Sequence, residues 1–454
     1  MTLDLLFTLK QNRLNLQSMV NYYAFSSVSR SQTNGYSCIC NDKEESKLFV
    51  YDCSSIKIWF DRIIELDIVL VVADSRDFYR NFLFLGKEFL SHIKIFDCKA
   101  FLHNYKNLKN VDVYSIILKN YQIDINSEID RFNKIWKIQG EKNWNRIPQD
   151  LLFVYLQKET LGIQKLINSL KKVHIDDQLK SYNNFFQEFL LYLVSLEETG
   201  IIDKNNNRIV PQYEYDRIVT GRIVNIKPFC YQTVYVNKIL NDYSYKSRFD
   251  DNGIFLIADW KNTDFRISAA LSKQSVKDRL KDPYLVYAKN VLHKNSITEE
   301  ERDEIKQKIL KDLYSSEESS FFDDYPDISN FKEKIILEAK QTKKITTYFG
   351  KSRYFVENDK FETKAFSCIN QMTVADLCKK AIIEMQKEFE ENKLESVPIP
   401  IVIYDSFTFD VKRDELEKVI LSIRKSLIER TIPDEFRFYV DFEVKISDLQ
   451  GNIY

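Results

Sequence analysis

The sequence has little glycine, proline and histidine, and it has no long hydrophobic run. Nine glycines, eight prolines and four histidines stand among its 454 residues, and the histidines form no cluster. Cys38 and Cys40 are the only close pair among seven cysteines, so we expect reduced, buried thiols and no zinc site. No apolar run approaches the roughly 20 residues of a membrane-spanning helix, and the N-terminus lacks the basic and apolar regions of a signal peptide. The sequence therefore predicts a soluble protein of a reducing compartment.

Neither sign of charge dominates the chain. Lysine and arginine number 66 against 67 aspartates and glutamates, which gives a formal net charge of −1. This balance excludes an overall basic protein, but it is compatible with a basic groove in one domain. Hydrophobic residues make up 44% of the 454 residues, which is enough for a sizeable core, and the length predicts two to four domains.

Two apolar stretches each end on a carboxylate. Residues 254–258 predict a buried strand that ends at Asp259, and a helical pattern follows with Phe265 facing inward. Residues 400–404 predict a second strand, which delivers Asp405 at a turn. A carboxylate at the end of a buried strand is costly unless it meets a cation. Two such carboxylates suit a pair of divalent ions that activate one oxygen and stabilise another.

A helix expected between the two carboxylates carries an unusual stripe. Residues 298–301 form a capping box that starts this helix. Arg302, Lys306, Leu310 and Tyr314 follow at steps of four residues, so they share one face. Two cations, an apolar residue and a phenol do not make a usual core face, and this stripe predicts a triphosphate-binding face. A solvated basic helix face is the alternative interpretation.

These stretches resemble the motifs of family A DNA polymerases, in a small, phage-type version. Asp259–Arg266 is similar to the palm pattern Asp-Tyr-Ser-x-x-Glu-x-Arg, and Ile403–Ser406 is similar to Val-His-Asp-Glu. The stripe follows Arg-x-x-x-Lys-x-x-x-Phe/Tyr-x-x-x-Tyr-Gly, with Leu310 at the aromatic position. Further similarities are Thr-Gly-Arg at residues 220–222, Gly-Lys-Ser-Arg-Tyr at 350–354 and Asn-Gln-Met-Thr-Val-Ala-Asp at 370–376.

The resemblance implies a site with two Mg²⁺ ions and gives each motif residue a role. Asp259 and Asp405 are implied as catalytic residues and, together with the backbone carbonyl of Trp260, as metal ligands. The nucleotide-binding residues implied are Arg302, Lys306, Leu310, Tyr314 and Asp264, the last of which can obstruct a ribose 2′-hydroxyl. The residues implied in primer-template binding are Thr220, Arg222, Arg248, Lys351, Arg353, Gln371, Tyr404 and Ser406.

The first part of the chain resembles, by layout, the 3′–5′ exonuclease domain that precedes the polymerase in this family. The residues that predict its strands and helices alternate along the sequence. Ser26 and Val28 stand where an active exonuclease needs two carboxylates on its first strand. Strands are expected at residues 22–25, 36–39, 47–51, 68–72 and 93–96, and helices at 56–66 and 78–89.

The other exonuclease signatures are incomplete. Asp97 is the better candidate for a carboxylate after a later strand, and Asp74 and Asp77 also stand near a strand end. The helical signature Tyr-x-x-x-Asp appears as Tyr155 followed by Glu159. Two metal ions cannot be held without the carboxylates of the first strand, so we expect this domain to be inactive as a nuclease.

The predicted fold is α/β and α+β multidomain: a right-hand polymerase with palm, fingers and a reduced thumb follows an RNase H-like, exonuclease-type α/β domain. The expected parts are residues 1–145 for the degenerate exonuclease-like domain, 146–205 for a helical linker and reduced thumb, 206–272 for the first part of the palm, 273–364 for the fingers, and 365–454 for the second part of the palm.

The resemblance implies template-directed transfer of deoxynucleotides to a primer 3′-hydroxyl, without proofreading. Two alternatives stay open. A single-subunit RNA polymerase would match Tyr404-Asp405-Ser406, because its motif is His-Asp-Ser. An eroded polymerase-derived subunit that only binds nucleic acid would explain the replaced motif residues. The implied partners are a DNA primer-template, deoxynucleoside triphosphates and a processivity or replisome protein, with no membrane. The implied location is the cytoplasm of a bacterial or phage-infected cell, or another reducing compartment that holds nucleic acid.

Overall fold

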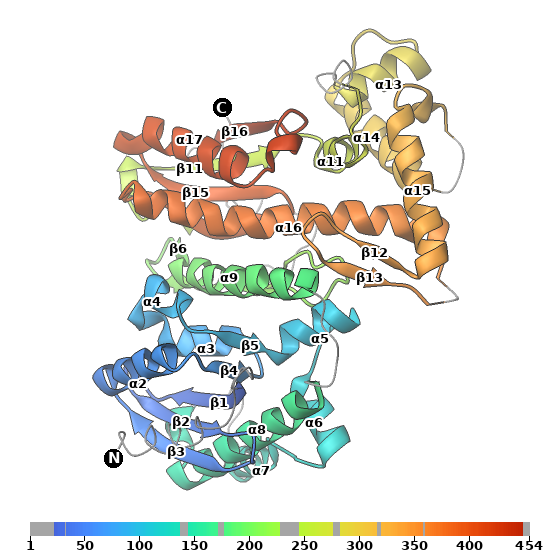
Figure 1. Ribbon diagram of the computed structural model, residues 1–454. Coiled ribbons are helices and arrows are strands. Elements are labelled where there is room, and N and C mark those ends of the chain that lie inside the picture. Colours follow the sequence, from blue (N-terminus) through green and yellow to red (C-terminus); the bar gives the residue numbers. More distant parts are fainter. Residues whose placement is uncertain are drawn as a thin grey trace. The chain divides into compact units, whose positions relative to one another are not determined.

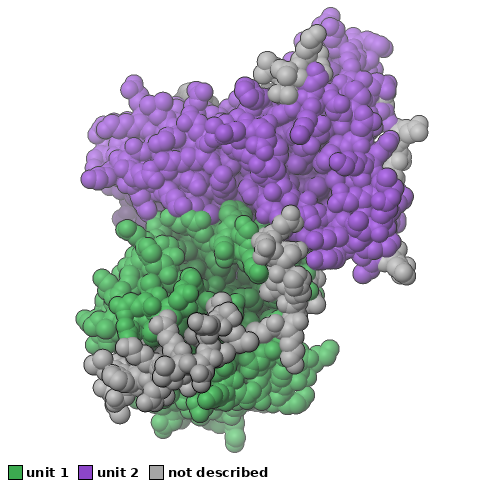
Figure 2. Space-filling model, viewed as in Figure 1, with its two compact units in different colours: residues 1–195 green, residues 196–454 purple. Residues whose placement is uncertain are grey.

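The computed structural model describes residues 22–31, 33–136, 144–170, 177–227, 245–275, 282–315, 319–356 and 359–447. The chain forms two compact units, residues 1–195 and residues 196–454 (Figure 2). The boundary between them falls inside α9 (Asp177–Thr199). In the part of the chain that the structure describes, no helix is both long enough and apolar enough to cross a membrane.

A five-stranded sheet forms the centre of the first unit. Its order is β3-β2-β1-β4-β5, with β1 antiparallel to β2 and parallel to β4 (Figure 1). The expected strands are confirmed, and the middle strands are the most buried because both of their faces are covered. The strands are β1 (Tyr22–Ser29), β2 (Gly35–Cys40), β3 (Ser46–Tyr51), β4 (Val69–Val72) and β5 (Ile95–Asp97).

Side chains along β1 point alternately to the two faces of the sheet, and helices pack against both faces. Ala24 belongs to an apolar cluster with α8 (Gln149–Leu170). Phe25 points to the other face, where it stacks on Trp59 of α2 (Cys53–Glu65) with ring centroids 5.4 Å apart. The remaining helices of this unit include α5 (Cys98–Lys106), α6 (Val113–Tyr121) and α7 (Ser127–Ile135).

The expectation of one helix over residues 78–89 was wrong. α3 (Ser75–Phe82) and a 3₁₀ turn (Leu83–Leu85) end at Gly86, and α4 (Lys87–Ser91) begins after it. Gly86 has a φ of 89°, a conformation that glycine adopts at little cost and that a right-handed helix does not contain. The apolar pattern alone does not reveal this break.

An antiparallel sheet of four strands organises the second unit. Its order is β14-β15-β11-β16, so β11 (Gly253–Trp260) lies between β15 (Ser406–Lys412) and β16 (Phe442–Ser447). The edge strand on the far side of β15 is β14 (Val397–Ile403). Every residue of β11 is buried except Asp259, which confirms the expected buried strand that ends on a carboxylate.

One face of this sheet packs against the long helix α16 (Phe361–Glu391), which runs along the strands in Figure 1. Phe409 of β15 stacks on Phe389 of α16 with ring centroids 5.4 Å apart. Because side chains alternate, Ser406 and the residues two and four positions after it face away from α16. α17 (Leu416–Arg424) packs against both α16 and β15.

A group of helices follows β11. The first of them, α11, buries Phe265, whose ring lies 4.8 Å from that of Tyr325 at the start of α15. The expected capping box is confirmed: Thr298 and Glu301 exchange hydrogen bonds at the start of α14. These elements are α11 (Thr263–Ser272), α13 (Pro283–Val291), α14 (Glu299–Tyr314), α15 (Pro326–Thr342) and the ribbon of β12 (Lys344–Thr346) and β13 (Ser352–Tyr354).

Short strands connect α9 to the main sheet of the second unit. They form a three-stranded sheet of order β10-β6-β7 and a separate pair, β8 and β9. Their bounds are β6 (Ile201–Asp203), β7 (Arg208–Ile209), β8 (Gln212–Glu214), β9 (Val224–Lys227) and β10 (Tyr245–Lys246). The mixed α/β fold is as expected, and its division into palm, fingers and thumb stays a prediction.

Candidate active site

Asp259 and Asp405 come together at one end of the four-stranded sheet. Asp259 is the second-last residue of β11, and Asp405 occupies the turn between β14 and β15. The amide of Trp260 donates a hydrogen bond of 3.4 Å to the carbonyl oxygen of Asp405, which joins the two strand ends. Tyr404 in the same turn has a φ of 57°, so the turn reverses the chain through a left-handed residue.

Burial and neighbouring carboxylates disfavour the ionised forms of Asp259 and Asp405. Burial, Asp405 and Glu443 raise the pKa of Asp259 to about 7. Burial also raises the pKa of Asp405. Carboxylates held together in this way are stabilised by a cation, and a divalent ion fits them and the nearby carbonyl of Trp260 because hard cations prefer oxygen ligands. Among the described residues, no three Asp, Glu, His or Cys side chains are grouped closely enough to hold a metal ion.

Thr263, the first residue of α11, contacts two of the expected metal ligands. Its hydroxyl lies 2.9 Å from the carbonyl oxygen of Trp260 and also donates to the carboxylate of Asp405. This hydrogen bond lowers the pKa of Asp405 against the effect of burial. The sequence analysis gave Thr263 no role, because a threonine at the start of a helix is common and its partner is far away in the chain.

Asp264 takes part in a polar network that links three helices and a turn. Arg222 approaches its carboxylate at 3.4 Å. Tyr314 of α14 hydrogen-bonds to the same carboxylate, and burial together with Asp264 raises the pKa of this phenol well above its usual value. Asn370 of α16 donates to the backbone carbonyl of Asp264 at 2.8 Å and to the hydroxyl of Tyr314 at 2.7 Å. The sequence placed Asn370 in a motif but gave it no contact.

The predicted stripe lies between the buried face of α14 and its most exposed positions, which are Asp303, Glu304, Gln307, Lys308 and Lys311. Its apolar positions Ile305, Ile309 and Leu313 are buried, while the four stripe residues are exposed or half-buried. Lys306 is exposed, and its charge opposes the rise in the pKa of Asp259.

Arg302, at the start of the stripe, is already held by two neighbours. It forms an ion pair of 2.8 Å with Asp282 and lies 4.5 Å from the ring centroid of Tyr284. Leu310 is half-buried, and the next stripe position is Tyr314, which bonds to Asp264. Along α14 the stripe therefore runs from two cations to an apolar residue and then to a hydrogen-bonded phenol.

Lys351 is buried, although a residue that contacts a template was expected at the surface. Its side chain is 1% exposed, and within the described residues its Nζ has no hydrogen-bond partner. Burial and the neighbouring Lys379 lower its pKa to about 7. Lys379 itself forms a buried ion pair of 2.7 Å with Asp376.

The Thr-Gly-Arg turn lies against these two lysines. Gly221 has a φ of 76°, which favours glycine, and a Cβ there would lie 2.4 Å from Nζ of Lys351, so the lysine side chain would have to shift. Thr220 is 7% exposed, and its hydroxyl has no hydrogen-bond partner in the described part of the chain. The guanidinium of Arg222 lies 5.3 Å from the ring centroid of Tyr404, which places the turn beside Asp405.

The other residues expected at the primer-template differ in their surroundings. The backbone amide and the Nε of Arg248 donate hydrogen bonds of 2.9 and 3.1 Å to the buried carboxylate of Asp410, so this side chain has a structural role. Arg353 is half-buried and lies 5.7 Å from the ring centroid of Phe355. Gln371 of α16 is half-buried. Ser406 pairs directly with Asp259 across β15 and β11.

In the first unit, hydrogen bonds join the residues at the expected exonuclease positions. Ser26 of β1 donates from its hydroxyl to one carboxylate oxygen of Glu159 on α8. Tyr114 donates to the other oxygen at 2.5 Å and lies 3.1 Å from the hydroxyl of Tyr155. Val28 is 2% exposed and belongs to the apolar core. A serine and a valine therefore occupy the two positions of the first strand where an active exonuclease needs carboxylates.

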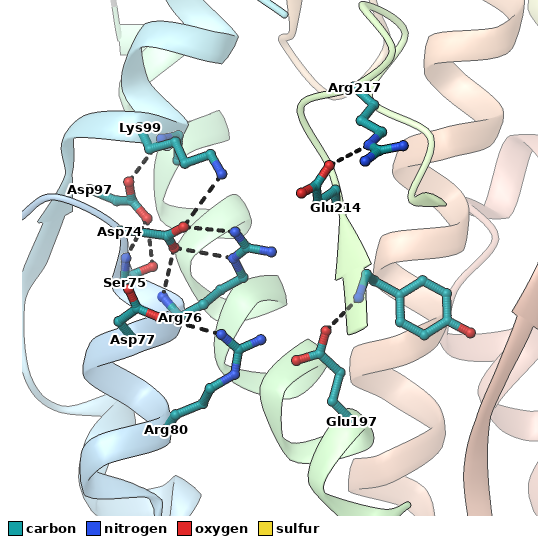
Figure 3. A network of polar contacts seen from close by, with 12 residues as sticks. Asp74, Ser75, Arg76, Asp77, Arg80, Asp97, Lys99, Glu197, Glu214 and Arg217 are labelled. Atoms are coloured by element: carbon teal, nitrogen blue, oxygen red, sulfur yellow. Dashed lines mark hydrogen bonds and ion pairs between the residues drawn. The ribbon is translucent and has the colours of Figure 1, made fainter. Parts of the chain in front are cut away.

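Asp97 at the end of β5 and the aspartates that follow β4 take part in another network of polar contacts (Figure 3). Asp97 accepts hydrogen bonds from the amide and the hydroxyl of Ser75, at 2.8 and 2.7 Å, and it caps α5. Asp74 pairs with Arg76 at 2.7 Å, and Lys99 lies 3.6 Å away. Asp77, the third expected aspartate, lies 3.4 Å from Arg80.

Comparisons in sequence find similarity between this chain and DNA polymerases. The family model for DNA polymerase family A matches residues 308–449. DNA polymerase I of Borreliella burgdorferi is 24% identical over 347 residues, which cover 69% of this chain and 37% of that protein. DNA polymerase I of Bacillus caldotenax is 25% identical over 107 residues, which cover 22% of this chain and 12% of that protein. The chain thus matches only part of the length of each relative.

The fold agrees with the sequence. The solved structure of the POL domain of Pol1 from M. smegmatis, in complex with DNA primer-template and dNTP, is similar with a TM-score of 0.59. The similarity covers 99% of this chain and 98% of that one at 11% sequence identity, so it concerns the fold. The region matched by the family contains the Asp405 turn and the long helix α16. In its sequence the chain is similar to DNA polymerases of family A, and in its fold it is similar to a polymerase domain.

Proposed function

We propose that this chain is a DNA-directed DNA polymerase, which transfers a deoxynucleotide from its triphosphate to a primer 3′-hydroxyl. The observation that carries the proposal is the pair of Asp259 and Asp405, which two strand ends bring together beside the cationic stripe of α14. The comparisons support this reading over the two alternatives, an RNA polymerase and a binding subunit without activity.

Asp259, Asp405 and the carbonyl of Trp260 are the residues that would hold two Mg²⁺ ions. Such ions, when bound, lower the pKa of the attacking hydroxyl and offset the charge of the leaving pyrophosphate. The chain's own contribution is to fix the oxygen ligands in place. The Trp260 amide joins the two strand ends, and the Thr263 hydroxyl orients the Asp405 carboxylate.

The stripe of α14 suits a nucleoside triphosphate. Arg302 can exchange Asp282 for phosphate oxygens, because a triphosphate carries more negative charge than one carboxylate and accepts bidentate hydrogen bonds. Lys306 adds an exposed point charge on the side of Asp259. Leu310 would pack on the sugar or base, and Tyr314 with Asp264 would line the sugar.

The residues around the Thr-Gly-Arg turn suit the primer-template. Arg222 is placed beside Tyr404 and Asp264, where it can reach a base edge or a phosphate near the primer end. Within the described residues, the hydroxyl of Thr220 and the amine of Lys351 have no hydrogen-bond partner, so both are available to nucleic acid. Arg353, Gln371, Tyr404 and Ser406 complete the set that we propose for primer-template contact, whereas Arg248 is left out because it bonds to Asp410.

We propose that the first unit is an exonuclease-like domain that does not proofread. A metal ion at this site would need carboxylates on β1 as well as on α8. Ser26 of β1 instead donates a hydrogen bond to Glu159, and Val28 lies in the apolar core. The division into palm, fingers and reduced thumb, and a processivity partner, are part of the same proposal.

Primer extension tests the proposal. The purified chain is given a labelled primer-template with each deoxynucleotide singly, then with ribonucleotides, with and without Mg²⁺. We expect Mg²⁺-dependent addition of the deoxynucleotide that the template specifies. Addition that ignores the template, or a preference for ribonucleotides, would contradict the proposal.

A further inference from the structure

Asn370 of α16 contacts both residues that we propose to line the sugar of the incoming nucleotide. Its side chain is fully buried, at 0% exposed. The amide nitrogen donates to the backbone carbonyl of Asp264 at 2.8 Å and to the hydroxyl of Tyr314 at 2.7 Å. One side chain therefore joins the first turn of α11 to the end of α14.

The amide of Asn370 sets the direction of the Tyr314 hydroxyl. A backbone carbonyl can only accept, so the nitrogen of the amide and not its oxygen faces Asp264. The second proton of this nitrogen goes to the oxygen of Tyr314. A phenol that accepts a hydrogen bond still has its own proton to donate. Asn370 therefore leaves the proton of Tyr314 for the carboxylate of Asp264, to which this hydroxyl hydrogen-bonds.

The two partners of Asn370 have other contacts that keep them in place. The carbonyl of Asp264 also accepts from the hydroxyl of Ser268 at 2.8 Å. The ring of Tyr314 packs beside that of Phe366, with centroids 6.3 Å apart. The distinct contribution of Asn370 is therefore the direction of one hydroxyl.

A buried amide is a costly way to fill the space between these helices. Within the described residues, the Oδ1 of Asn370 has no hydrogen-bond partner. An unpaired buried acceptor lowers the free energy of unfolding, and an apolar side chain of similar shape avoids this loss. Departures of this kind from the rules of core packing are typical of functional sites.

We propose that Asn370 is a positioning residue for sugar selection, which directs the Tyr314 hydroxyl so that the Asp264 carboxylate stays beside the sugar. This inference rests on the proposed function. A carboxylate that accepts from Tyr314 is restrained, and a restrained carboxylate obstructs a ribose 2′-hydroxyl better than one that turns aside. Without Asn370 the phenol oxygen loses its donor, and the hydroxyl can rotate away from Asp264.

The test measures kcat and KM of the full chain for matched deoxy- and ribonucleotides on one primer-template. Asn370→Leu removes both donated bonds and keeps the branched shape of the side chain. We expect it to relax discrimination against ribonucleotides about two- to tenfold, the effect of one hydrogen bond. The change should appear as a lower KM for the ribonucleotide, while kcat for the deoxynucleotide stays close to that of the wild type.

Two further variants serve as control and as second probe. Thr373→Val is the matched control, because this buried hydroxyl on α16 donates to the carbonyl of Ile369 in its own helix, at 2.8 Å. It should discriminate as the wild type does. Asn370→Asp keeps the size of the side chain, but a carboxyl group has at most one proton and cannot serve both partners. It should also relax discrimination.

A double variant shows whether Asn370 acts through Tyr314. In the Tyr314→Phe background there is no hydroxyl to direct, so adding Asn370→Leu should change discrimination no further. A residue that only supports the packing of α16 would instead add its own effect. Thermal melting and primer-template binding of each variant confirm that the protein compared is folded.

The outcomes separate this inference from the proposed function. If the wild type extends the primer and both Asn370 variants discriminate as it does, the inference is wrong and the proposed function stands. Additive effects of Asn370→Leu and Tyr314→Phe would also overturn the inference. A wild type that does not extend the primer would contradict the proposed function, and the inference with it.

Discussion

Thr263 donates a hydrogen bond from its hydroxyl to the carboxylate of Asp405, across more than a hundred residues of sequence. The same hydroxyl lies 2.9 Å from the carbonyl oxygen of Trp260. One short side chain therefore touches two of the three groups that we propose as metal ligands. Its effect is to orient Asp405 and to oppose the rise of its pKa that burial causes.

Replacing Thr263 by valine should weaken the metal site without unfolding the chain. We expect the Mg²⁺ concentration for half-maximal extension to rise about tenfold or more. The pKa of Asp405 should rise, because the hydrogen bond that lowers it is gone. A protonated carboxyl binds metal poorly, so the acid limb of the pH–activity profile should move to higher pH. Thr263→Ser keeps the hydroxyl and should behave as the wild type; equal profiles for valine and serine would contradict this role.

Asp264 should set the choice between deoxyribose and ribose. Aspartate is one methylene shorter than the glutamate of the family motif, so we predict weak discrimination against ribonucleotides. A pocket difference of this size is worth about 1–3 kcal/mol, or roughly 10- to 200-fold. Asp264→Glu should sharpen discrimination and Asp264→Ala should relax it, as measured by kcat/KM for matched deoxy- and ribonucleotides.

Tyr314 provides the control for this prediction. Tyr314→Phe removes the hydrogen bond to the Asp264 carboxylate but keeps the ring, so it should change discrimination in the same direction as Asp264→Ala and by less. If all four proteins discriminate equally, Asp264 is not the residue that selects the sugar.

Burying the amine of Lys351 should lower the free energy of unfolding, whereas the same amine should favour DNA binding. Burial and Lys379 lower its pKa from 10.5 to about 7, so between these pH values the unfolded chain binds a proton that the folded chain does not. The free energy of unfolding should therefore rise with pH over this window, and the cost is complete below it. Lys351→Met should raise stability near pH 7, flatten the pH dependence and weaken primer-template binding.

Urea unfolding at several pH values and DNA titration check both halves of this prediction. Lys418→Met, on the exposed face of α17, is the control and should change neither. A less stable Lys351→Met, or one that binds DNA as tightly as the wild type, would be inconsistent with this account.

The first unit should not shorten a primer. In the absence of nucleotides, a labelled primer with a mismatched 3′ end should stay intact with Mg²⁺ or Mn²⁺, because Ser26 and Val28 provide no metal ligands. Metal-dependent shortening that disappears in Glu159→Gln or Asp97→Asn would show that the domain is an active nuclease.

Local patterns were sufficient to find Asp259, Asp405 and the stripe that starts at Arg302. An apolar run that stops at a carboxylate and a step of four residues are both visible in a few residues of sequence. The strands of the first sheet, and β11 and β14 of the second, followed for the same reason. The helix break at Gly86 was missed because the apolar pattern continues through it.

The rest depends on contacts between distant parts of the chain. Glu443 meets Asp259 only through the register of β16 against β11, and Asn370 meets Asp264 only through the packing of α16 on α11. Lys351 belongs to a strongly basic stretch, which predicts exposure, yet the Gly221 turn and Lys379 enclose it. The residues next to such positions in the sequence do not reveal their roles, because each role depends on a contact with a residue far away in the chain.

The most direct measurement is primer extension by Asp259→Asn and Asp405→Asn, alongside titration of the same proteins with a fluorescent primer-template. Each substitution removes one carboxylate of the pair at the strand ends and keeps the size of the side chain. We predict that both variants bind the primer-template as the wild type does and that neither extends it at any Mg²⁺ concentration. Appreciable extension by either variant would contradict the assignment of this pair as the catalytic centre.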